Sequence, residues 1–599
     1  MDIGTISLVL MLGLMLLLAI GMPLGLASAV LAVLVLVMKF EPALIMNPLS
    51  FGEGILTGRP GTGPLNILAQ KIYGLLTDYV LISIPLFIFM ASLLERSGIA
   101  KDMYSSLSLW LNRTRGGIAI VTSIMAVIMA AMSGIIGGEV VLLGLIALPQ
   151  MLRLGYNQNL AIGTICASGS LGTMIPPSIV LIIYGLITET SIKALFTASF
   201  LPGFMLASFF IVYIIVRTRL RPQDAPLPEP QPGEPVGLEK LGLFGAFLAV
   251  LTAGVCTVLC LRALFFTITG QNVDLGDGVD PIFWGTPDYV PWFGGIVAIC
   301  LALIYFAFGI ERTTKGWLLG KGLVAPIVVI GVVMGSIYGG ITGITEAAGM
   351  GALSVYLLMT LYQKDFNGWM SLLIKNAKWI GLYVVVVLIA PQFFIASENL
   401  GVTQTMGTLF VLLLLTLRLP AVQDGLWDSL MRTLKSTGTI IWVTIGAAAL
   451  AGAYTIAGGP TYVAEFIVGS DLPTMGIILA MMVILLFMGA FMDWVGIVLL
   501  IIPVFLPIVQ RLPIEEIGFY GTLEPQHVAI WFGVVFCMNM QVSFLSPPFG
   551  PAAFYLKSVA PPHISLTDIF KGFLPFIAIQ ICALSVLLIY PPIIAFLLP

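Results

Sequence analysis

The sequence predicts an all-α polytopic membrane protein, and three observations carry this prediction. Of the 599 residues, 59% are hydrophobic and only 9% are charged, whereas ordinary soluble domains are about 25% charged. Many apolar runs reach the length of about 20 residues that a helix needs to cross a bilayer, so lipid is the expected solvent for most of the chain. Two of these runs contain a double proline, Pro176-Pro177 and Pro547-Pro548, where the helices are expected to be broken.

The chain begins with an apolar run, residues 6–38, which is too long for a signal peptide and is expected to stay as a membrane helix. A stretch rich in glycine and proline, residues 47–73, follows it and is expected to be a loop. We divide the chain into an N-terminal scaffold helix and loop (1–78), a first repeat (79–203), a linker with an inserted pair of helices (204–322), central scaffold helices (323–439) and a second repeat (440–599).

The first repeat and the second repeat share a spacing of acidic residue and proline. Glu139 precedes Pro149 by ten residues, and Asp493 precedes Pro503 by ten residues. A turn with glycine lies just upstream of each acid, and a double proline follows in each repeat. This pattern predicts an internal duplication in which each half has a re-entrant helical hairpin and a broken helix. Paired half-helices of this kind are typical of a transport site near the bilayer midplane.

The inserted segment has two apolar runs, residues 241–261 and 292–310, with basic residues outside them and acidic residues between them. By the positive-inside rule, both basic clusters are expected in the cytoplasm and the acidic loop in the periplasm. The basic residues are Arg217, Arg219, Arg221, Arg312, Lys315 and Lys321, and the acidic residues are Asp274, Asp277, Asp280 and Asp288.

The two broken helices have the chemistry of an ion and anion site. Glycines on the run 168–178 let the backbone leave helical geometry, and the prolines stop its immediate return. The freed carbonyls are oxygen donors for a small cation, and the helix that starts near Pro177 offers its N-terminus to an anion. The run 539–550 adds side-chain oxygens from Asn539, Gln541, Ser543 and Ser546. The alternatives are a proline kink that serves packing alone and hydrogen bonds between packed helices.

Three acids, Glu139, Glu346 and Asp493, lie within membrane runs, where an ionisable residue is a functional candidate by default. They could balance a cation, relay protons, or cap the second arm of a hairpin. Only two histidines occur, and neither a GxxxxGK[ST] loop nor an HExxH helix is present, which excludes an ATP motor and disfavours an intramembrane enzyme. The sequence has no strongly basic patch, so no nucleic-acid partner is expected.

A set of short motifs resembles the large membrane subunit of TRAP (tripartite ATP-independent periplasmic) transporters over residues 5–220 and 323–597. The matching positions are Gly21, Pro23, Pro85-Leu86-Phe87, Ser97-Gly98-Ile99-Ala100, Ser133-Gly134, Pro149, Gly155-Tyr156, Gly169, Gly172, Pro176-Pro177-Ser178, Tyr184-Gly185, Pro202-Gly203, Thr345-Glu346-Ala347-Ala348, Phe491-Met492-Asp493, Pro503, Pro507, Asn539 and Pro547-Pro548 through Gly550.

The resemblance implies a sodium-coupled importer of a small organic acid, such as a carboxylate, in the bacterial cytoplasmic (inner) membrane. It implies inverted repeats that move like an elevator, a small four-helix membrane subunit on a separate chain, and a periplasmic substrate-binding protein that delivers the organic anion. A stand-alone cation/anion symporter of a related fold is the nearest alternative.

The resemblance also implies site residues. Sodium (Na+) ligands would be Ser133, Gly172, Ile175 and Pro177 in the first repeat and Asn539, Ser543 and Ser546 in the second repeat, with Gly340 and Thr345 as further contributors. Residues that contact the substrate or gate its path would be Gly134, Glu139, Ser178, Asp493, Pro547 and Pro548. The substrate carboxylate is expected at helix N-termini, because no arginine occupies an obvious midplane position.

This chain departs from the family pattern at two turns. Where the family often has Ser-Gly-Ser-Ser, the chain has Ser133-Gly134-Ile135-Ile136, so two hydroxyls are replaced by apolar side chains. Where the family has Thr-Pro-Thr-Glu, the chain has Gly343-Ile344-Thr345-Glu346. Either backbone carbonyls suffice as cation ligands here, or this site differs from that of the family.

Overall fold

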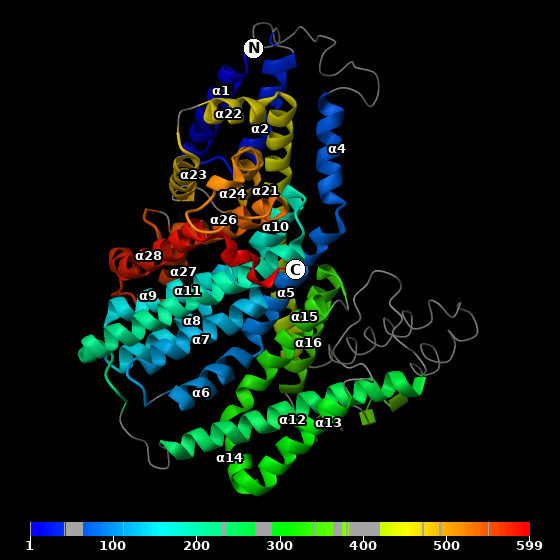
Figure 1. Ribbon diagram of the computed structural model, residues 1–599, viewed down its shortest axis with the longest axis vertical. Helices are drawn as coiled ribbons and strands as arrows, with labels where there is room; N and C mark the ends of the chain where they lie inside the picture. The colour runs from blue at the N-terminus through cyan, green and yellow to red at the C-terminus, as the bar shows by residue number, and fades with distance from the viewer. Residues whose placement is uncertain are drawn as a thin grey trace.

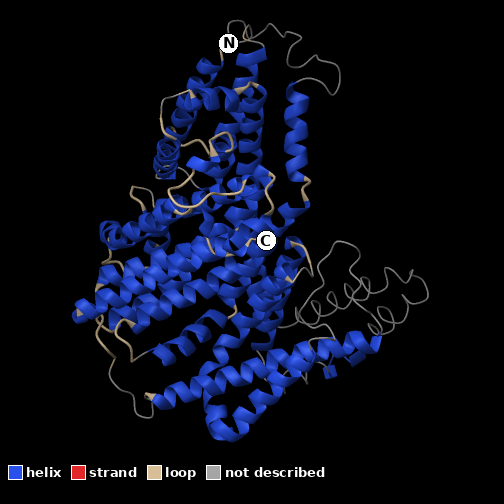
Figure 2. Ribbon diagram, viewed as in Figure 1, coloured by secondary structure: helices blue, strands red, loops and turns tan. Residues whose placement is uncertain are grey.

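The computed structural model describes residues 2–40, 42, 64–111, 113–228, 235, 237–269, 290–339, 342–362, 374–375, 377–378, 381, 420–469, 472–489, 494–548 and 550–598. Within these residues the regular elements are all helices (Figure 2). Nine of the described helices are long and apolar enough to cross a membrane, and six shorter apolar helices accompany them. The prediction of an all-α polytopic membrane protein is confirmed.

The N-terminal part contains two more helices than the sequence predicts, because the apolar run 6–38 is divided into two helices and a third helix follows. It is built from α1 (Ile3–Ala19), α2 (Leu24–Phe40) and α4 (Pro64–Leu76). The predicted loop over 47–73 is therefore wrong for its last ten residues, because Pro64 stands at a helix start, where its missing N–H costs nothing. Residues 47–63 of that predicted loop lie outside the described residues.

The first repeat contains a pair of helices joined by a tight turn, then a broken helix, then a long helix with an internal proline. Its elements are η1 (Tyr79–Ile82), α5 (Ser83–Arg96), α6 (Ile99–Leu111), α7 (Gly117–Ser133), α8 (Ile136–Arg153), α9 (Gln158–Gly169), η2 (Ser170–Thr173), α10 (Ile179–Thr188) and α11 (Ile192–Leu220). Pro202 lies inside α11. In Figure 1, α7, α8 and α11 lie side by side as a stack of nearly parallel rods.

The same order of elements returns in the C-terminal part. Its elements are α21 (Pro420–Ile456), α22 (Gly459–Val468), α23 (Thr474–Gly489), α24 (Trp494–Leu500), α25 (Ile502–Val509), η8 (Ile514–Glu516), η9 (Pro525–His527), α26 (Val528–Leu545), α27 (Pro551–Lys557), α28 (Leu566–Ile589) and η10 (Pro591–Leu597). The long helix α28 again contains a proline, Pro575. The inverted relation of the two repeats stays a prediction.

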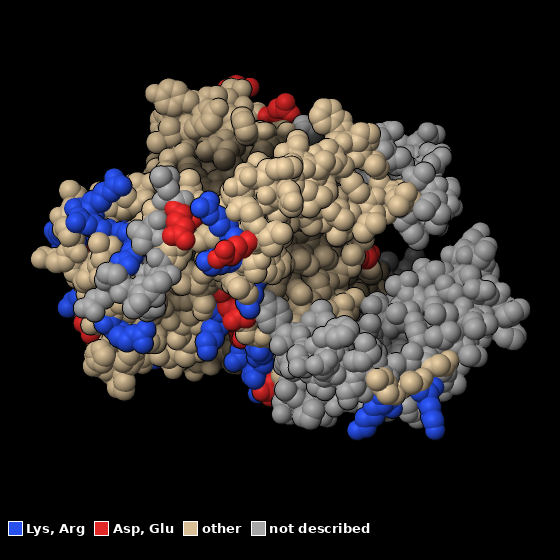
Figure 3. Space-filling model, turned by 90° about the horizontal axis from the view of Figure 1, so that it is seen from below, with Lys and Arg blue, Asp and Glu red and all other residues tan. Residues whose placement is uncertain are grey.

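Between the repeats lie η3 (Pro222–Asp224), α12 (Leu238–Thr269), α13 (Val290–Ala302), the π-helical segment η5 (Leu303–Phe308), α14 (Ile310–Gly320), η6 (Lys321–Leu323), α15 (Val324–Tyr338) and α16 (Ile344–Tyr362). The two expected helices of the insertion are present as α12 and α13, which pack against each other at one end of the molecule (Figure 1). The acidic loop lies outside the described residues, so its periplasmic location stays a prediction. Seen from that end, charged side chains gather on one part of the face, and uncharged residues cover much of the rest (Figure 3).

A close approach fastens the N-terminal scaffold to the second repeat. α2 packs along α21, and a Cβ added to Gly446 would collide with the backbone carbonyl of Gly25. The two glycines therefore let the helix backbones touch, as small residues do at contacts between membrane helices. On the other side of α21 lies α5, which also packs against α16.

A buried ion pair holds the end of α11 against the start of α9. The Arg217 guanidinium donates to Asp224 Oδ2 at 2.9 Å, to Tyr213 Oη at 2.7 Å and to Asn157 Oδ1 at 3.3 Å. The Arg217 and Asp224 side chains keep 16% and 10% of their exposure. The cluster therefore stabilises the connection on which the first broken helix depends.

Replacing Arg217 with glutamine is expected to lower the free energy of unfolding by about 2 to 3 kcal/mol, because the Asp224 carboxylate is left buried without its cation. Thermal unfolding of the purified protein in detergent measures the change. The control is Arg219→Gln, two residues away and exposed, which should change stability by less than about 0.5 kcal/mol. Equal losses in both variants would contradict a specific role for the buried pair.

Candidate functional site

The first hairpin turns at Gly134, directly against the first broken helix. α7 ends at Ser133, Gly134 takes a left-handed conformation with φ 62°, and α8 starts after the extended residue Ile135. A Cβ added to Gly134 would collide with the carbonyl oxygen of Pro177. Both the backbone angle and the close approach thus require glycine at this turn.

The first break runs from the end of η2 to the start of α10. The Pro176-Pro177 bond is cis, and Ser178 is the N-cap of α10. The Ser178 hydroxyl donates to the Thr173 carbonyl at 2.5 Å and accepts from the Leu181 amide at 3.4 Å. The helix therefore starts at Ile179, two residues after the predicted position, and the whole segment is buried.

Glu139 lies in the first turn of α8 and is buried to 1% exposure. Its Oε1 accepts from the Ser133 hydroxyl, so its hydrogen bond closes the hairpin turn and does not cap a backbone amide in the described part of the chain. Its Oε2 is buried and has no hydrogen-bond partner there. A Cβ added to Gly172 would lie 2.5 Å from Glu139 Oε1, so Gly172 gives the carboxylate its space.

The second break has a similar plan with a different environment. α26 ends at Leu545, the Pro547-Pro548 bond is cis, and the Gly550 amide donates to the Ser546 carbonyl at 3.0 Å. The Ser546 hydroxyl donates to the Val542 carbonyl at 2.8 Å. Pro547 and Pro548 are exposed, whereas Pro176 and Pro177 are buried.

The second hairpin packs against this break through α23 and α26. Asn539 Nδ2 donates to the Met482 carbonyl at 2.9 Å, and Asn539 Oδ1 is buried with no partner in the described residues. A Cβ added to Gly489, the last residue of α23, would collide with the Ser543 side chain. Asp493 lies outside the described residues.

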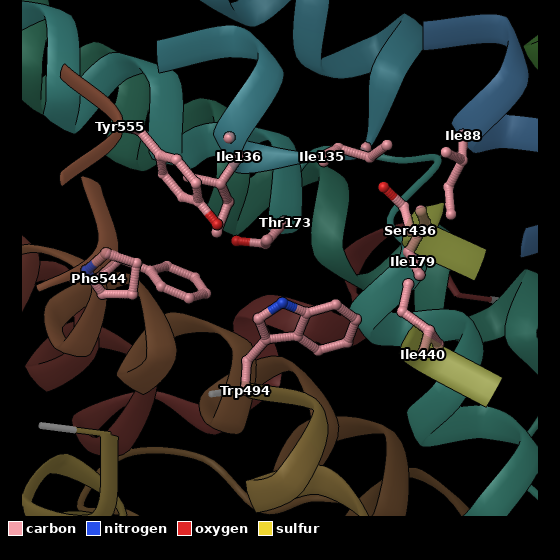
Figure 4. Close-up of a pocket in the computed structure, with 13 residues that line it drawn as sticks. Ile88, Ile135, Ile136, Thr173, Ile179, Ser436, Ile440, Trp494, Phe544 and Tyr555 are labelled. Atoms are coloured by element: carbon pink, nitrogen blue, oxygen red, sulfur yellow. The ribbon is translucent and has the colours of Figure 1, made fainter. Parts of the chain in front are cut away.

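One hydrogen bond and one cavity join the two breaks. Gln541 Nε2 of α26 donates to Thr173 Oγ1 of η2 at 2.5 Å. A cavity of about 90 Å³, the first cavity, opens beside this bond, with Thr173 and Tyr555 on one side and Trp494 opposite them (Figure 4). It is lined by Ile88, Gly134, Ile135, Ile136, Gly137, Thr173, Ile179, Ser436, Ile440, Trp494, Phe544, Pro551 and Tyr555. Both breaks and both hairpins therefore contribute to one cavity.

A second cavity of about 120 Å³ lies next to the first cavity. The two cavities share Ile88, Ile135 and Ser436. The second cavity also contacts Ala91, Ser92, Glu95, Met129, Ser133, Gly138, Glu139 and Arg432. Arg432 and Glu95 lie in helices without a turn motif, which is why the sequence did not single them out.

Among the predicted sodium ligands that the structure describes, Ser133 lines the second cavity. Those that line neither cavity are Gly172, Ile175, Pro177, Thr345, Asn539, Ser543 and Ser546. The Thr345 hydroxyl donates to the Tyr79 carbonyl at 3.2 Å in the first turn of α16, and neither residue lines the first or the second cavity. Gly340 lies outside the described residues. Ile175 is buried beside Gly203 of α11. The metal roles of all the predicted ligands stay predictions.

The site offers unsatisfied oxygens of the kind that a hard cation prefers. Glu139 Oε2, Asn539 Oδ1 and Gln541 Oε1 are all buried without a partner in the described residues. Carboxylate and amide oxygens are hard ligands, and a buried polar atom is costly until something binds it. Of these three residues, Glu139 lines the second cavity, and Asn539 and Gln541 line neither cavity.

A membrane protein that brings two broken helices and a hairpin turn to one shared cavity has the architecture of a secondary transporter. A family model described as "Tripartite ATP-independent periplasmic transporter, DctM component" matches residues 10–593. The chain belongs to this family. It is therefore a TRAP permease of the inner membrane and not an enzyme.

Several relatives carry the same family name. The C4-dicarboxylate TRAP transporter large permease protein DctM of Vibrio cholerae is 22% identical over 525 residues, which is 88% of this chain and 87% of that protein. The DctM protein of Pseudomonas aeruginosa is 33% identical over 187 residues, 31% of this chain and 44% of that protein, so this match spans less than half the length of that relative. The isethionate TRAP transporter permease protein DctMQ of Oleidesulfovibrio alaskensis is 22% identical over 586 residues, 97% of this chain and 68% of that protein. Among solved structures, the YdaH transporter of Alcanivorax borkumensis matches with a TM-score of 0.45 and 13% identity over 94% of this chain and 97% of that chain.

Proposed function

We propose that this chain is the large membrane subunit of an importer that couples the entry of sodium to the entry of a small organic acid. The observation that carries the proposal is the first cavity, where the Gly134 turn, the first break and the second break meet. A cation and an anion bound in one small cavity attract each other, so each favours the binding of the other. Binding coupled in this way is what symport requires.

Sodium is favoured by the oxygens of the first hairpin turn, of which Ser133 lines the second cavity, and by those of α26 and the second break. Ser133, Asn539, Ser543 and Ser546 supply hydroxyl or amide oxygens, and the Pro177 carbonyl faces the Gly134 turn. Histidine is absent from the lining of both cavities, and the second cavity contains two acids, Glu95 and Glu139. Glu95 is paired with Arg432, so Glu139 is the acid there that has no ion-pair partner, which supports an alkali cation better than a relay of protons between carboxylates.

The cargo anion is proposed to be an organic acid delivered by a periplasmic substrate-binding protein, with a small four-helix membrane subunit on a separate chain completing the carrier. The relatives' names speak of C4-dicarboxylate, isethionate, ectoine and sialic acid, which share a small polar skeleton with a charged acid group. The start of α10, capped by the buried Ser178, offers amide groups and the positive end of its dipole to such an anion. An elevator-like motion of the repeats against the scaffold is the proposed transport step.

The test is uptake by the chain reconstituted in liposomes with its small subunit and binding protein, using succinate, isethionate and N-acetylneuraminate in turn. Uptake is expected with an inward sodium gradient and not with a proton gradient alone. Uptake that needs no binding protein would favour the stand-alone symporter. Uptake that persists on the proton gradient in the absence of sodium would reject sodium coupling.

In the same assay, Ser546→Val is expected to raise the sodium concentration for half-maximal uptake about 5- to 10-fold, as the loss of one oxygen ligand would. The control is Ser585→Val in α28, whose hydroxyl makes the same bond to the carbonyl four residues earlier, at 2.8 Å, but away from the second break. An identical sodium titration for Ser546→Val and the wild-type protein would remove Ser546 from the ion site.

A further inference from the structure

The second cavity holds a charged pair that the sodium site does not explain. Arg432 Nη1 lies 2.5 Å from Glu95 Oε2, and both residues line the cavity beside Ser133 and Glu139. The Glu95 side chain keeps 18% of its exposure, whereas the Arg432 side chain keeps 55%. Arg432 is thus the more exposed member of the pair, and it reaches the cavity from α21.

A neighbouring pair shows that Arg432 is not needed merely to clip two helices together. Arg96 Nη1 lies 2.8 Å from Asp428 Oδ2, which joins the same two helices, α5 and α21. In this pair the arginine lies on α5 and the acid lies on α21, the reverse of the Arg432–Glu95 pair. Neither Arg96 nor Asp428 lines the first or the second cavity. An ion pair can therefore join α5 to α21 without placing a charge at the cavity.

The surroundings of Arg432 suit a carboxylate. Ser436 lies one helical turn farther along the same face of α21, lines both cavities, and stands beside Ile88 in Figure 4. The Ser92 hydroxyl also lines the second cavity; Ser92 is 6% exposed, and its oxygen has no hydrogen-bond partner among the described residues. A guanidinium fork has five N–H donors, and the bond to Glu95 uses Nη1, so the fork can hold a second acid group.

We infer that Arg432, with Ser436 and Ser92, binds the carboxylate or sulfonate group of the transported acid, and that Glu95 is its counter-ion when the cargo is absent. This inference rests on the proposed function, and it places the acid group of the cargo at Arg432 in the second cavity instead of at the start of α10 beside the first cavity. The cation end is the Ser133–Glu139 turn, which lines the same cavity. Arg432 is therefore the residue that makes the site selective for acids over neutral molecules of equal size.

The two members of the pair are expected to act in opposite directions. Arg432→Gln should raise the dissociation constant of the acid about 10- to 100-fold, as the loss of a hydrogen-bonded charge would. Glu95→Gln should lower it, because the cargo no longer competes with a resident carboxylate. A purely structural clip would weaken binding in both variants alike. Arg432→Lys, which keeps the charge and loses the fork, should give an intermediate value.

The measurement is equilibrium binding of the acid that the wild-type complex transports best, among succinate, isethionate and N-acetylneuraminate, to the purified complex with its small subunit in sodium-containing detergent solution. Arg96→Gln is the matched control and should change the dissociation constant less than about 2-fold. If Arg432→Gln does not fold, Glu95→Gln and Arg432→Lys carry the test.

Unchanged binding in Arg432→Gln, or equal losses in Arg432→Gln and Arg96→Gln, would overturn the inference while sodium-driven uptake by the wild-type complex still stands. Weaker binding in Glu95→Gln would overturn it as well. A wild-type complex that takes up none of the three acids on a sodium gradient would overturn the proposed function together with this inference.

Discussion

A valine in place of Gly134 is expected to reduce sodium-driven uptake about 100-fold or more. A β-branched residue with φ near 62° costs about 1 to 2 kcal/mol, and overpacking of a closed contact costs about 1 to 3 kcal/mol. The added Cβ would collide with the Pro177 carbonyl, which belongs to the backbone and cannot rotate away. The turn would therefore withdraw from the first break, and with it the oxygens that face the cavity. Initial rates of uptake in liposomes measure the loss.

The matched control is Gly98→Val. Gly98 also has a positive φ, 79°, but a Cβ added there would meet nothing within 4 Å. This variant should lose stability to a similar backbone strain and keep most of its uptake. If both variants lost uptake to the same degree, backbone strain alone would account for the defect, and the contact with Pro177 would carry no special role.

Gly172→Val is expected to raise the sodium concentration for half-maximal uptake about 10-fold or more, because the new methyl groups would displace the Glu139 carboxylate. The Gly172 position leaves only 2.5 Å between a Cβ and Glu139 Oε1. Glu139 Oε2 is buried without a hydrogen-bond partner in the described residues. Displacing this oxygen should therefore weaken the binding of sodium more than the binding of the transported acid. Sodium titrations of uptake at a saturating acid concentration measure this effect.

Two further variants separate packing from charge at this point. Glu139→Gln keeps the shape of the side chain and removes its charge, so it should weaken sodium activation without disturbing the fold. Gly335→Val, on α15, places the same side chain at a helical glycine with open space around it, and should leave the sodium titration unchanged. A normal titration in Gly172→Val would show that the Glu139 carboxylate can move freely and is no ligand.

The repeated motifs predicted the local architecture of the site well, because proline and glycine act through the backbone. The double prolines predicted both helix breaks, and the Ser133-Gly134 pair predicted the hairpin turn that packs on the first break. The start of α10 at Ile179 differs from the predicted Pro177 because Ser178 forms the cap, a side-chain bond that composition does not reveal. α4 was missed because a glycine- and proline-rich stretch hides its short amphipathic pattern.

Contacts between distant segments could not be predicted from one sequence. Thr173 and Gln541 are separated by most of the chain, and nothing in either local pattern shows that they bond. Arg432 lies in a regular helix with ordinary polar neighbours, and only the packing of α21 on α5 turns it toward a cavity. Such positions depend on tertiary packing, which a helical period does not encode.

The bond between Gln541 and Thr173 also limits how a carrier of this shape can work. If the two broken helices separated, the buried Gln541 amide and the buried Thr173 hydroxyl would lose their hydrogen bond. Leaving each group without a partner would cost about 1 to 3 kcal/mol. We therefore expect the two broken helices to move together as one rigid body while the surrounding segments open and close, and we do not expect them to separate from each other.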